Sequence, residues 1–274
     1  MCLLSYNSNG LRNLPLEEAI RSVAEAGYDG IELSLHKTKF NPLTLQPQEL
    51  EAIKEIIAST GLRVSCIAGG TADILSDVMY EPGLIAVSSE ERHRRVDLIC
   101  RTMDVASYLE VPVVNFASGL LPSGMEAETA RAHLMAGIKT CINYRKDVIL
   151  AIEPEPGMFI ETTGQAIELI EALDSSRFAL NLDIGHVYCC EENYLAKIER
   201  ALEFSAHIHV EDIRGRIHHH EIPGTGEIDF AAFARLCRQK DYHNFVSVEL
   251  YHHAEVWPQA LQQSKDFLTD ILKY

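Results

Sequence analysis

The chain lacks several features that mark whole classes of protein. Only one of its 274 residues is tryptophan, and its seven cysteines are scattered with no C-x-x-C pair among them. Seven scattered cysteines without such a pair argue against a disulfide framework or a zinc ribbon, so we expect reduced and mostly buried thiols. No apolar stretch approaches the roughly 20 uncharged residues that a membrane span needs. We therefore expect no membrane partner.

Positive charge is also scarce. Lysine and arginine total 24 against 40 aspartates and glutamates, which gives a net charge of −16. The negative electrostatic potential of such a chain repels phosphate backbones and anionic lipid surfaces, so nucleic acid is not expected as a partner. A local arginine can still make the potential inside a cleft positive. The segment 1–7 has no basic region before an apolar run, so no export signal is visible and a cytoplasmic location is expected.

Short apolar runs rich in β-branched residues alternate with amphipathic segments along the chain. The expected strands cover 3–6, 30–33, 62–67, 111–116, 148–153, 178–183, 206–210 and 245–250. The expected helices cover 16–26, 50–57, 90–109, 126–145, 163–173, 193–203, 229–239 and 258–272. Eight βα units predict an α/β fold with one closed (β/α)8 TIM barrel domain over 1–274. An open doubly wound sheet is the alternative, but the segment after the first strand, 7–10, is not G-x-G-x-x-G.

Two connections are longer than the loops usual between such elements. They cover 68–88, after the third strand, and 211–228, after the seventh. Both follow the carboxyl ends of strands, where barrel enzymes build their sites. We expect them to form lids over a site.

Four consecutive strands end in a side chain that can bind a metal. These are Glu153, Asp183, His209 and Glu249, separated by 30, 26 and 40 residues, which is close to one βα unit each. Neighbouring strands lie about 4.8 Å apart, so the four strand ends can converge on one ion. A lone carboxylate at a strand end is common without a metal, but three together would repel each other and lose solvation unless a cation compensates them. The set predicts one divalent ion, Mn²⁺ first, with Mg²⁺, Co²⁺ or Zn²⁺ as alternatives.

The sequence around these residues resembles the xylose isomerase-like barrel superfamily, which includes sugar isomerases and epimerases, inosose-processing enzymes and AP endonucleases. The similarity lies in the segments 152–154 (IEP), 182–186 (LDIGH), 207–212 (HIHVED), 223–230 (PGTGEIDF) and 246–250 (VSVEL). The resemblance implies that the four strand-end residues bind the metal. It implies that His186 touches the substrate or a second metal. Relatives often associate, which leaves a homodimer open.

The chemistry implied is proton transfer next to a carbonyl of a small-molecule substrate. A divalent ion chelated by a carbonyl and a neighbouring hydroxyl oxygen acidifies the C–H between them and stabilises an enediolate. Glu153 and Glu249 could then flank the carbon as an acid–base pair. Return of the proton to the same carbon gives epimerisation, and return to the adjacent carbon gives aldose–ketose isomerisation. Either glutamate can be the base.

Further residues are candidates for binding the substrate. His220, Arg214 and Arg216 lie in the 211–228 loop, where relatives often carry an arginine or histidine before the glycine turn. Smaller candidates follow or end the first four strands, or open the last helix: Asn7, His36, Cys66, Asn115 and Trp257. Asp212 is expected to orient His209. Glu211 stands where some epimerases of the family carry a second histidine, which weakens the assignment to a ketohexose epimerase.

Three other functions remain open. The same site could expel a β-hydroxyl, as in a dehydratase of the inosose or dehydroshikimate type. An AP endonuclease-like phosphodiester hydrolase would need three zinc ions and further histidines at the ends of strands two to four. There the chain offers His36, Cys66 and Asn115, and its negative charge opposes DNA. A binding protein without activity would not need both Glu153 and Glu249.

Overall fold

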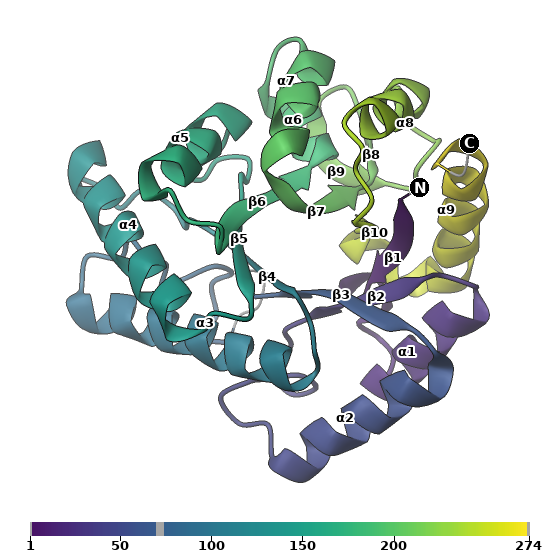
Figure 1. Cartoon of the computed structure of the whole chain (residues 1–274), viewed down its shortest axis with the longest axis horizontal. Helices are drawn as coiled ribbons and strands as arrows, with labels where there is room; N and C mark the ends of the chain where they lie inside the picture. Colours follow the sequence, from purple (N-terminus) through teal and green to yellow (C-terminus); the bar gives the residue numbers. More distant parts are fainter. Residues whose placement is uncertain (1, 70–73, 273–274) are drawn as a thin grey trace.

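The computed structural model of the chain describes residues 2–69 and 74–272. Eight parallel strands close into a barrel in the order β1-β10-β7-β6-β5-β4-β3-β2. Figure 1 looks into this barrel, with the helices arranged around its outside. The barrel strands are β1 (Leu3–Asn7), β2 (Gly30–Ser34), β3 (Arg63–Ala68), β4 (Val113–Ala117), β5 (Ile149–Glu153), β6 (Phe178–Asp183), β7 (Ser205–Val210) and β10 (Phe245–Val248). The predicted TIM barrel is confirmed.

The strands are apolar because both of their faces are covered. All five residues of β2 are buried, and so are all four of β10. One face of each strand packs inside the barrel and the other packs against the helices, which is why these strands read as short apolar runs instead of alternating patterns. The register is regular at the functional edge, where Asp183 of β6 pairs with His209 of β7.

Two of the outer helices show clear capping at their ends. Pro47 opens α2, and Gly61 ends it with φ of 73°, a left-handed conformation that favours glycine. Thr162 and Gln165 form a reciprocal capping box at the start of α5. The outer helices are α1 (Leu16–Glu25), α2 (Pro47–Thr60), α3 (Ser89–Tyr108), α4 (Ala127–Tyr144), α5 (Thr163–Leu173), α7 (Tyr194–Ala201), α8 (Phe230–Gln239) and α9 (Trp257–Leu272). In the described part of the chain, none of the helices has the length and apolarity to cross a bilayer.

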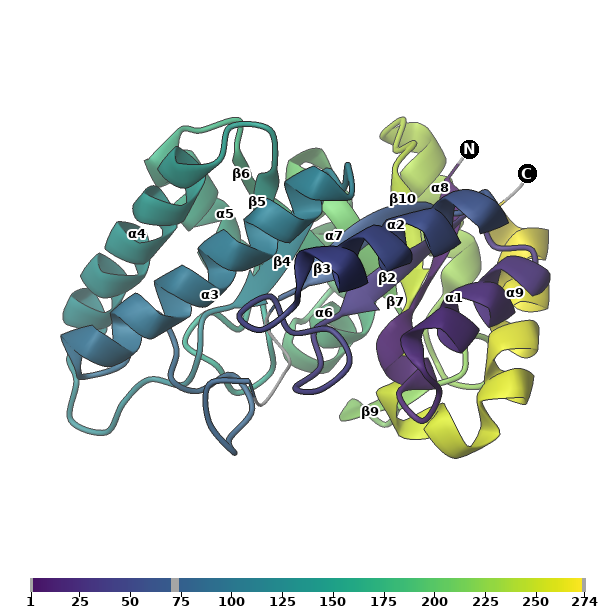
Figure 2. The ribbon, with the colours of Figure 1, turned by 90° about the horizontal axis from the view of Figure 1, so that it is seen from below.

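Short elements follow several strands at their carboxyl ends. They are η1 (Ser8–Leu11), α6 (Ile184–Cys190), the antiparallel pair β8 (Asp212–Arg214) and β9 (Ile217–Glu221), and η3 (Tyr251–Val256), while η2 (Leu202–Phe204) precedes β7. The connection expected over 211–228 is thus built around a hairpin. Of the connection expected over 68–88, positions 70–73 lie outside the described residues. Figure 2 shows β9 and the loop before α3 at the same end of the barrel.

Candidate functional site

The four predicted strand-end side chains lie together at the carboxyl ends of neighbouring strands. Glu153 ends β5, Asp183 ends β6, His209 lies in β7, and Glu249 follows the last residue of β10. These strands are adjacent in the barrel, in the order β10-β7-β6-β5. One ligand atom from each residue lies within 4.8 Å of the others, and all four side chains are buried.

The imidazole of His209 faces the three carboxylates with its Nδ1 atom. Nδ1 is 2.9 Å from Glu153 Oε1, 3.4 Å from Glu249 Oε2 and 3.9 Å from Asp183 Oδ2. Burial alone would lower the pKa of His209, but the surrounding carboxylates raise it well above its usual value. The protein therefore favours positive charge at the point where the four side chains meet.

A fifth carboxylate, Glu32 of β2, holds the other side of this imidazole. Both oxygens of Glu32 accept hydrogen bonds from His209 Nε2, at 2.9 and 3.0 Å, and Oε2 also accepts one from His207 Nε2 at 3.0 Å. Glu32 is fully buried, and the two histidines keep its pKa far below the usual range despite that burial. With Nε2 protonated, the lone pair of Nδ1 can bind a metal.

These groups fit a divalent cation. Asp183 Oδ2 is buried and has no hydrogen-bond partner among the described residues, so one lone pair at the centre of the cluster is unused. Three carboxylates and a neutral imidazole are a donor set that suits Mn²⁺, Mg²⁺, Co²⁺ or Zn²⁺. Glu153, Asp183, His209 and Glu249 would hold the ion.

Gly185 of the D-x-G-H motif leaves space for a buried glutamate. A Cβ atom at Gly185 would lie 1.6 Å from Glu211 Oε1. Glu211 is fully buried, and burial together with the charge of Asp183 raises its pKa well above the usual value. One oxygen of Glu211 lies within 4.8 Å of one oxygen of Asp183, and neither oxygen of Glu211 has a hydrogen-bond partner among the described residues. A proton on Glu211, donated to Asp183, removes this repulsion.

Two further histidines lie beside the cluster with fixed ring orientations. His186, which the structure places on α6 and not in a loop, directs Nδ1 to the carbonyl oxygen of Pro154 at 3.0 Å. Its Nε2 is buried and has no hydrogen-bond partner among the described residues. Burial lowers the pKa of His186, but Asp183 and other carboxylates outweigh burial and raise it to about 9. His186 can therefore donate a hydrogen bond to a ligand oxygen in the cavity that it lines.

In contrast to that of His186, the environment of His220 favours the neutral imidazole. Its Nδ1 donates to the backbone carbonyl of Glu249 at 3.0 Å, and burial lowers its pKa. His218 Nε2 lies 3.0 Å from His220 Nε2, so one ring donates and the other accepts. The ring of Tyr251 packs edge-on against His220, with centroids 4.7 Å apart.

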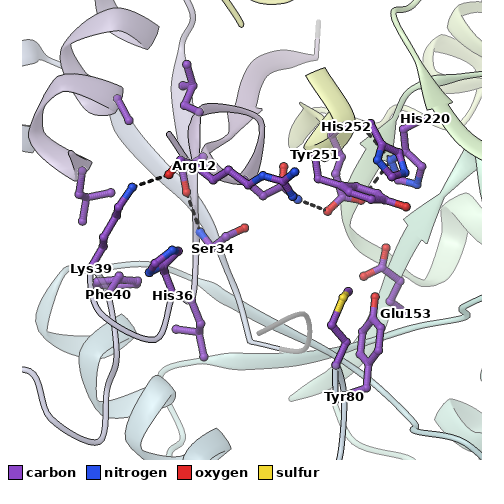
Figure 3. Close-up of a pocket in the computed structure, with 18 of the residues that line it drawn as sticks. Arg12, Ser34, His36, Lys39, Phe40, Tyr80, Glu153, His220, Tyr251 and His252 are labelled. Atoms are coloured by element: carbon purple, nitrogen blue, oxygen red, sulfur yellow. Dashed lines mark hydrogen bonds and ion pairs between the residues drawn. The ribbon is translucent and has the colours of Figure 1, made fainter. Parts of the chain in front are cut away.

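A cavity of about 640 Å³ opens beside these groups. Figure 3 shows Glu153, His220 and Tyr251 around one end of it, with Tyr80 close by. Glu155 lines the same end, and the hydroxyl of Tyr80 donates to its Oε2 at 3.3 Å. Burial raises the pKa of Glu155 to about 8. The sequence pattern does not single out Tyr80 or Tyr251 as contact residues, because an irregular segment positions Tyr80 and the short helix η3 positions Tyr251.

Three predicted substrate-binding residues are absent from the described lining of the cavity. Asn7 donates to Glu249 Oε1 at 3.2 Å, and Asn115 lies 3.4 Å from Glu32 Oε1 and accepts a hydrogen bond from the backbone of Gly69. Cys66 is fully buried inside the barrel. His36 lines the cavity at its far side, next to the bridge that it forms with Phe40.

Three more predicted residues are also outside the described cavity lining. Arg214 is exposed at the end of β8, and Arg216 bonds to Glu192 and to the carbonyl oxygen of Glu191. Trp257 opens α9 and is partly buried against the core.

The prediction that Asp212 orients His209 is wrong. The Asp212 carboxylate accepts four backbone N–H groups, from Ile213, Gly224, Gly226 and Ile228, at 2.8–3.0 Å. Asp212 therefore shapes the 211–228 connection, and Glu32 orients the histidine. The signal for Glu32 in the sequence was a charged residue in the middle of an apolar strand.

The chain belongs to the xylose isomerase-like TIM barrel family, whose model matches residues 20–271. Curated relatives include the hydroxypyruvate isomerase of Escherichia coli K12, 23% identical over 82% of this chain and 84% of the relative. The L-ribulose 3-epimerase of Methylomonas sp. strain DH-1 is 26% identical over 88% of this chain and 80% of its own.

Solved structures support the fold. A D-psicose 3-epimerase crystallised in the presence of D-fructose superposes with a TM-score of 0.81 at 14% identity and covers 99% of this chain and 100% of its own. The IolI protein with a bound zinc atom superposes with a TM-score of 0.80 at 17% identity and covers 99% of this chain and 98% of its own.

Proposed function

We propose that the chain is a divalent-metal-dependent isomerase or epimerase of a small polyhydroxylated carbonyl compound: a sugar, a sugar phosphate or an inosose. The observation that carries this proposal is the meeting of Glu153 and Glu249 at the ends of two strands, β5 and β10, that are separated in the barrel by β6 and β7. Their oxygens lie 2.9 and 3.4 Å from His209 Nδ1. Both carboxylates also line the cavity. They can therefore reach a substrate carbon from different directions.

The chain's own residues would move the proton. The environment favours a charged Glu249, because His209 and His220 outweigh the effect of burial and lower its pKa. Burial raises the pKa of Glu153, so this carboxyl takes up a proton more readily. A bound cation would favour the ionised form of both carboxyls, so that either could accept the proton that leaves the substrate. When bound, the divalent ion would polarise the substrate carbonyl and stabilise the negative charge that follows deprotonation.

The neighbouring residues would hold the substrate. His186 offers an unused N–H, and the buried carboxyl of Glu155 with the Tyr80 hydroxyl offers further polar contacts for sugar hydroxyls. The curated relatives support this chemistry, since they include hydroxypyruvate isomerases, a fructoselysine 3-epimerase and a 3-dehydro-D-guloside 4-epimerase. In such reactions a proton leaves a carbon next to a carbonyl, and its site of return distinguishes isomerase from epimerase.

Deuterium exchange tests the proposal even where the product is unidentified. The Mn²⁺-loaded protein is incubated in D₂O with hydroxypyruvate, D-fructose, L-ribulose, a 3-ketoglucoside, a ketose phosphate and an inosose, and each is followed by NMR. We expect deuterium to enter next to the carbonyl of at least one compound, with formation of its isomer or epimer. Loss of water from the probe would indicate a lyase instead. Absence of exchange in the whole panel would contradict the proposal.

A further inference from the structure

The cavity continues away from the carboxylates into a second region, which we call the outer lobe. Its walls are η1, the start of α1 and the 35–40 segment, and Figure 3 shows Phe40, Lys39 and His36 at the opposite side from Glu153 and His220. The outer lobe is defined by the apolar residues Leu11, Leu14, Leu16, Leu35 and Phe40 and the cations Arg12 and Lys39, with Ser34, His36 and Asp77 as further polar residues in its lining.

The apolar walls of the outer lobe do not match a free sugar. A polyol carries a hydroxyl on nearly every carbon, and each hydroxyl placed against a leucine or phenylalanine side chain loses its hydrogen bonds to water without a replacement. An apolar group placed there is stabilised by leaving water. The inner end of the cavity is different, because Glu153, His186 and His220 supply polar atoms.

The charge of the outer lobe is opposite to that of the whole chain. In the described chain, neither Arg12 nor Lys39 forms an ion pair with a carboxylate. The Lys39 ammonium donates to the backbone carbonyl oxygens of Arg12 and Leu14, so its charge is held in place but not neutralised. Asp77, the acidic residue beside them, pairs with Lys37 at 3.2 Å. In a chain with a net charge of −16, two such cations attract an anionic group.

The volume of the cavity also indicates a ligand larger than a free sugar. At about 640 Å³ the cavity lies in the range of about 300–1,000 Å³ that holds drug-sized ligands. A hexose or a three-carbon acid is smaller than the drug-sized ligands that such a cavity holds, and either would leave part of the outer lobe filled with water.

We infer that the substrate is a carbonyl sugar with a substituent, and that the outer lobe binds this substituent through its apolar body and its anionic end. The inference rests on the proposed function for the sugar end of the ligand. The outer lobe recognises the rest: apolar contact with Leu14, Leu16 and Phe40, and charge contact with Arg12. The sugar carbonyl then lies at the carboxylate end of the same cavity.

A fragment-binding experiment tests the outer lobe apart from any turnover. The Mg²⁺-loaded protein is titrated with 3-phenylpropionate, which has an apolar body and one carboxylate, and binding is followed by ligand-observed NMR and calorimetry. We expect saturable binding that Arg12→Ala weakens by about tenfold or more, the size of effect typical of a lost charge-assisted hydrogen bond. The alcohol 3-phenylpropanol should bind more weakly than the acid, and 3-phenylpropylamine weaker still.

The matched control is Arg21→Ala, which removes an exposed arginine paired with Glu17 on α1 and should leave binding unchanged. No saturable binding, or equal affinity in the wild type and in Arg12→Ala, would overturn the inference; the second result would place the carboxylate on the metal. Glu153→Gln should abolish proton exchange and still bind the fragment. Failure of the proposed function would therefore appear in the exchange assay, and failure of the outer-lobe inference would appear in the fragment-binding assay.

Discussion

Glu32 holds His209 in place by accepting the Nε2–H of the imidazole with both carboxylate oxygens, at 2.9 and 3.0 Å. The contact joins β2 to β7 across the interior of the barrel. It fixes the ring so that Nδ1 points at Glu153, Asp183 and Glu249. A negative charge behind the ring also makes the imidazole a stronger metal ligand.

We therefore expect Glu32→Gln to weaken metal binding by about 10–100-fold, the usual effect of losing a carboxylate behind a metal-binding histidine. Calorimetric titration with Mn²⁺ measures it directly. The control is Glu25→Gln at an exposed position of α1, which should change nothing. Equal Mn²⁺ affinity in Glu32→Gln and wild type would show that Glu32 has no such role.

Much of the fold was predictable from the sequence because the strands and helices carry separate periodic patterns. The boundaries differ by a few residues: the strand expected over 245–250 ends at Val248, and the one expected over 111–116 begins at Val113. The convergence of the four strand ends followed from chain order alone, since parallel strands of a closed barrel point the same way.

The rest of the site depends on contacts that chain order does not determine. Glu32 and His209 are 177 residues apart, and their pairing follows from which side chains point inward on strands that do not pair with each other. The position of Tyr80 depends on the path of an irregular segment, and that of Tyr251 on the short helix η3 that follows β10. Arg214 and Arg216 are predicted to bind the substrate because relatives often carry an arginine or histidine before the glycine turn, but the β8–β9 hairpin places them outside the described cavity lining.

Glu153 and Glu249 should each be essential for proton exchange. Glu153→Gln and Glu249→Gln keep the shape of each side chain and remove its ability to accept a proton, so each should reduce exchange by at least about 10²–10⁴-fold. Circular dichroism and thermal unfolding should show an intact fold. The exposed change Glu192→Gln is the matched control. Retained exchange in either variant would disprove the two-carboxylate mechanism.

Gly185→Ala should disturb Glu211 beneath the cluster. The added methyl group would lie 1.6 Å from Glu211 Oε1 and 2.7 Å from its Cδ, so the buried side chain must move. We expect a loss of about 1–3 kcal/mol of unfolding free energy, as for other overpacked cores. Urea denaturation measures it, with Gly164→Ala as a control because a Cβ there meets nothing closer than 3.9 Å. Stability equal to that of the control would contradict this account of Gly185.

His218 gives the protein a pH dependence below neutrality. Burial and the neighbouring His186 and His220 lower the pKa of His218 to about 4. Between the usual histidine pKa and this value the unfolded chain binds a proton that the folded chain does not, so stability is lost as pH falls from 7 toward 4.

His218→Gln removes this dependence. Because His218 is partly exposed, solvent reduces the effect, and we expect the variant to gain about 1 kcal/mol relative to wild type between pH 7 and pH 5. Urea unfolding at both pH values measures the difference. His93→Gln, at an exposed position of α3, is the control for losing a histidine. If the difference in unfolding free energy between His218→Gln and wild type is the same at pH 7 and pH 5, His218 does not cause the pH dependence.

The central claim is that one divalent ion lies among Glu153, Asp183, His209 and Glu249. Crystals grown after incubation with Mn²⁺ can be measured at an energy where manganese scatters anomalously, alongside elemental analysis of the protein in solution. The account predicts one ion per chain and one anomalous peak in contact with all four side chains. An empty site after incubation with Mn²⁺, Mg²⁺, Co²⁺ and Zn²⁺ salts in turn, or a peak elsewhere with these four side chains unengaged, would contradict it.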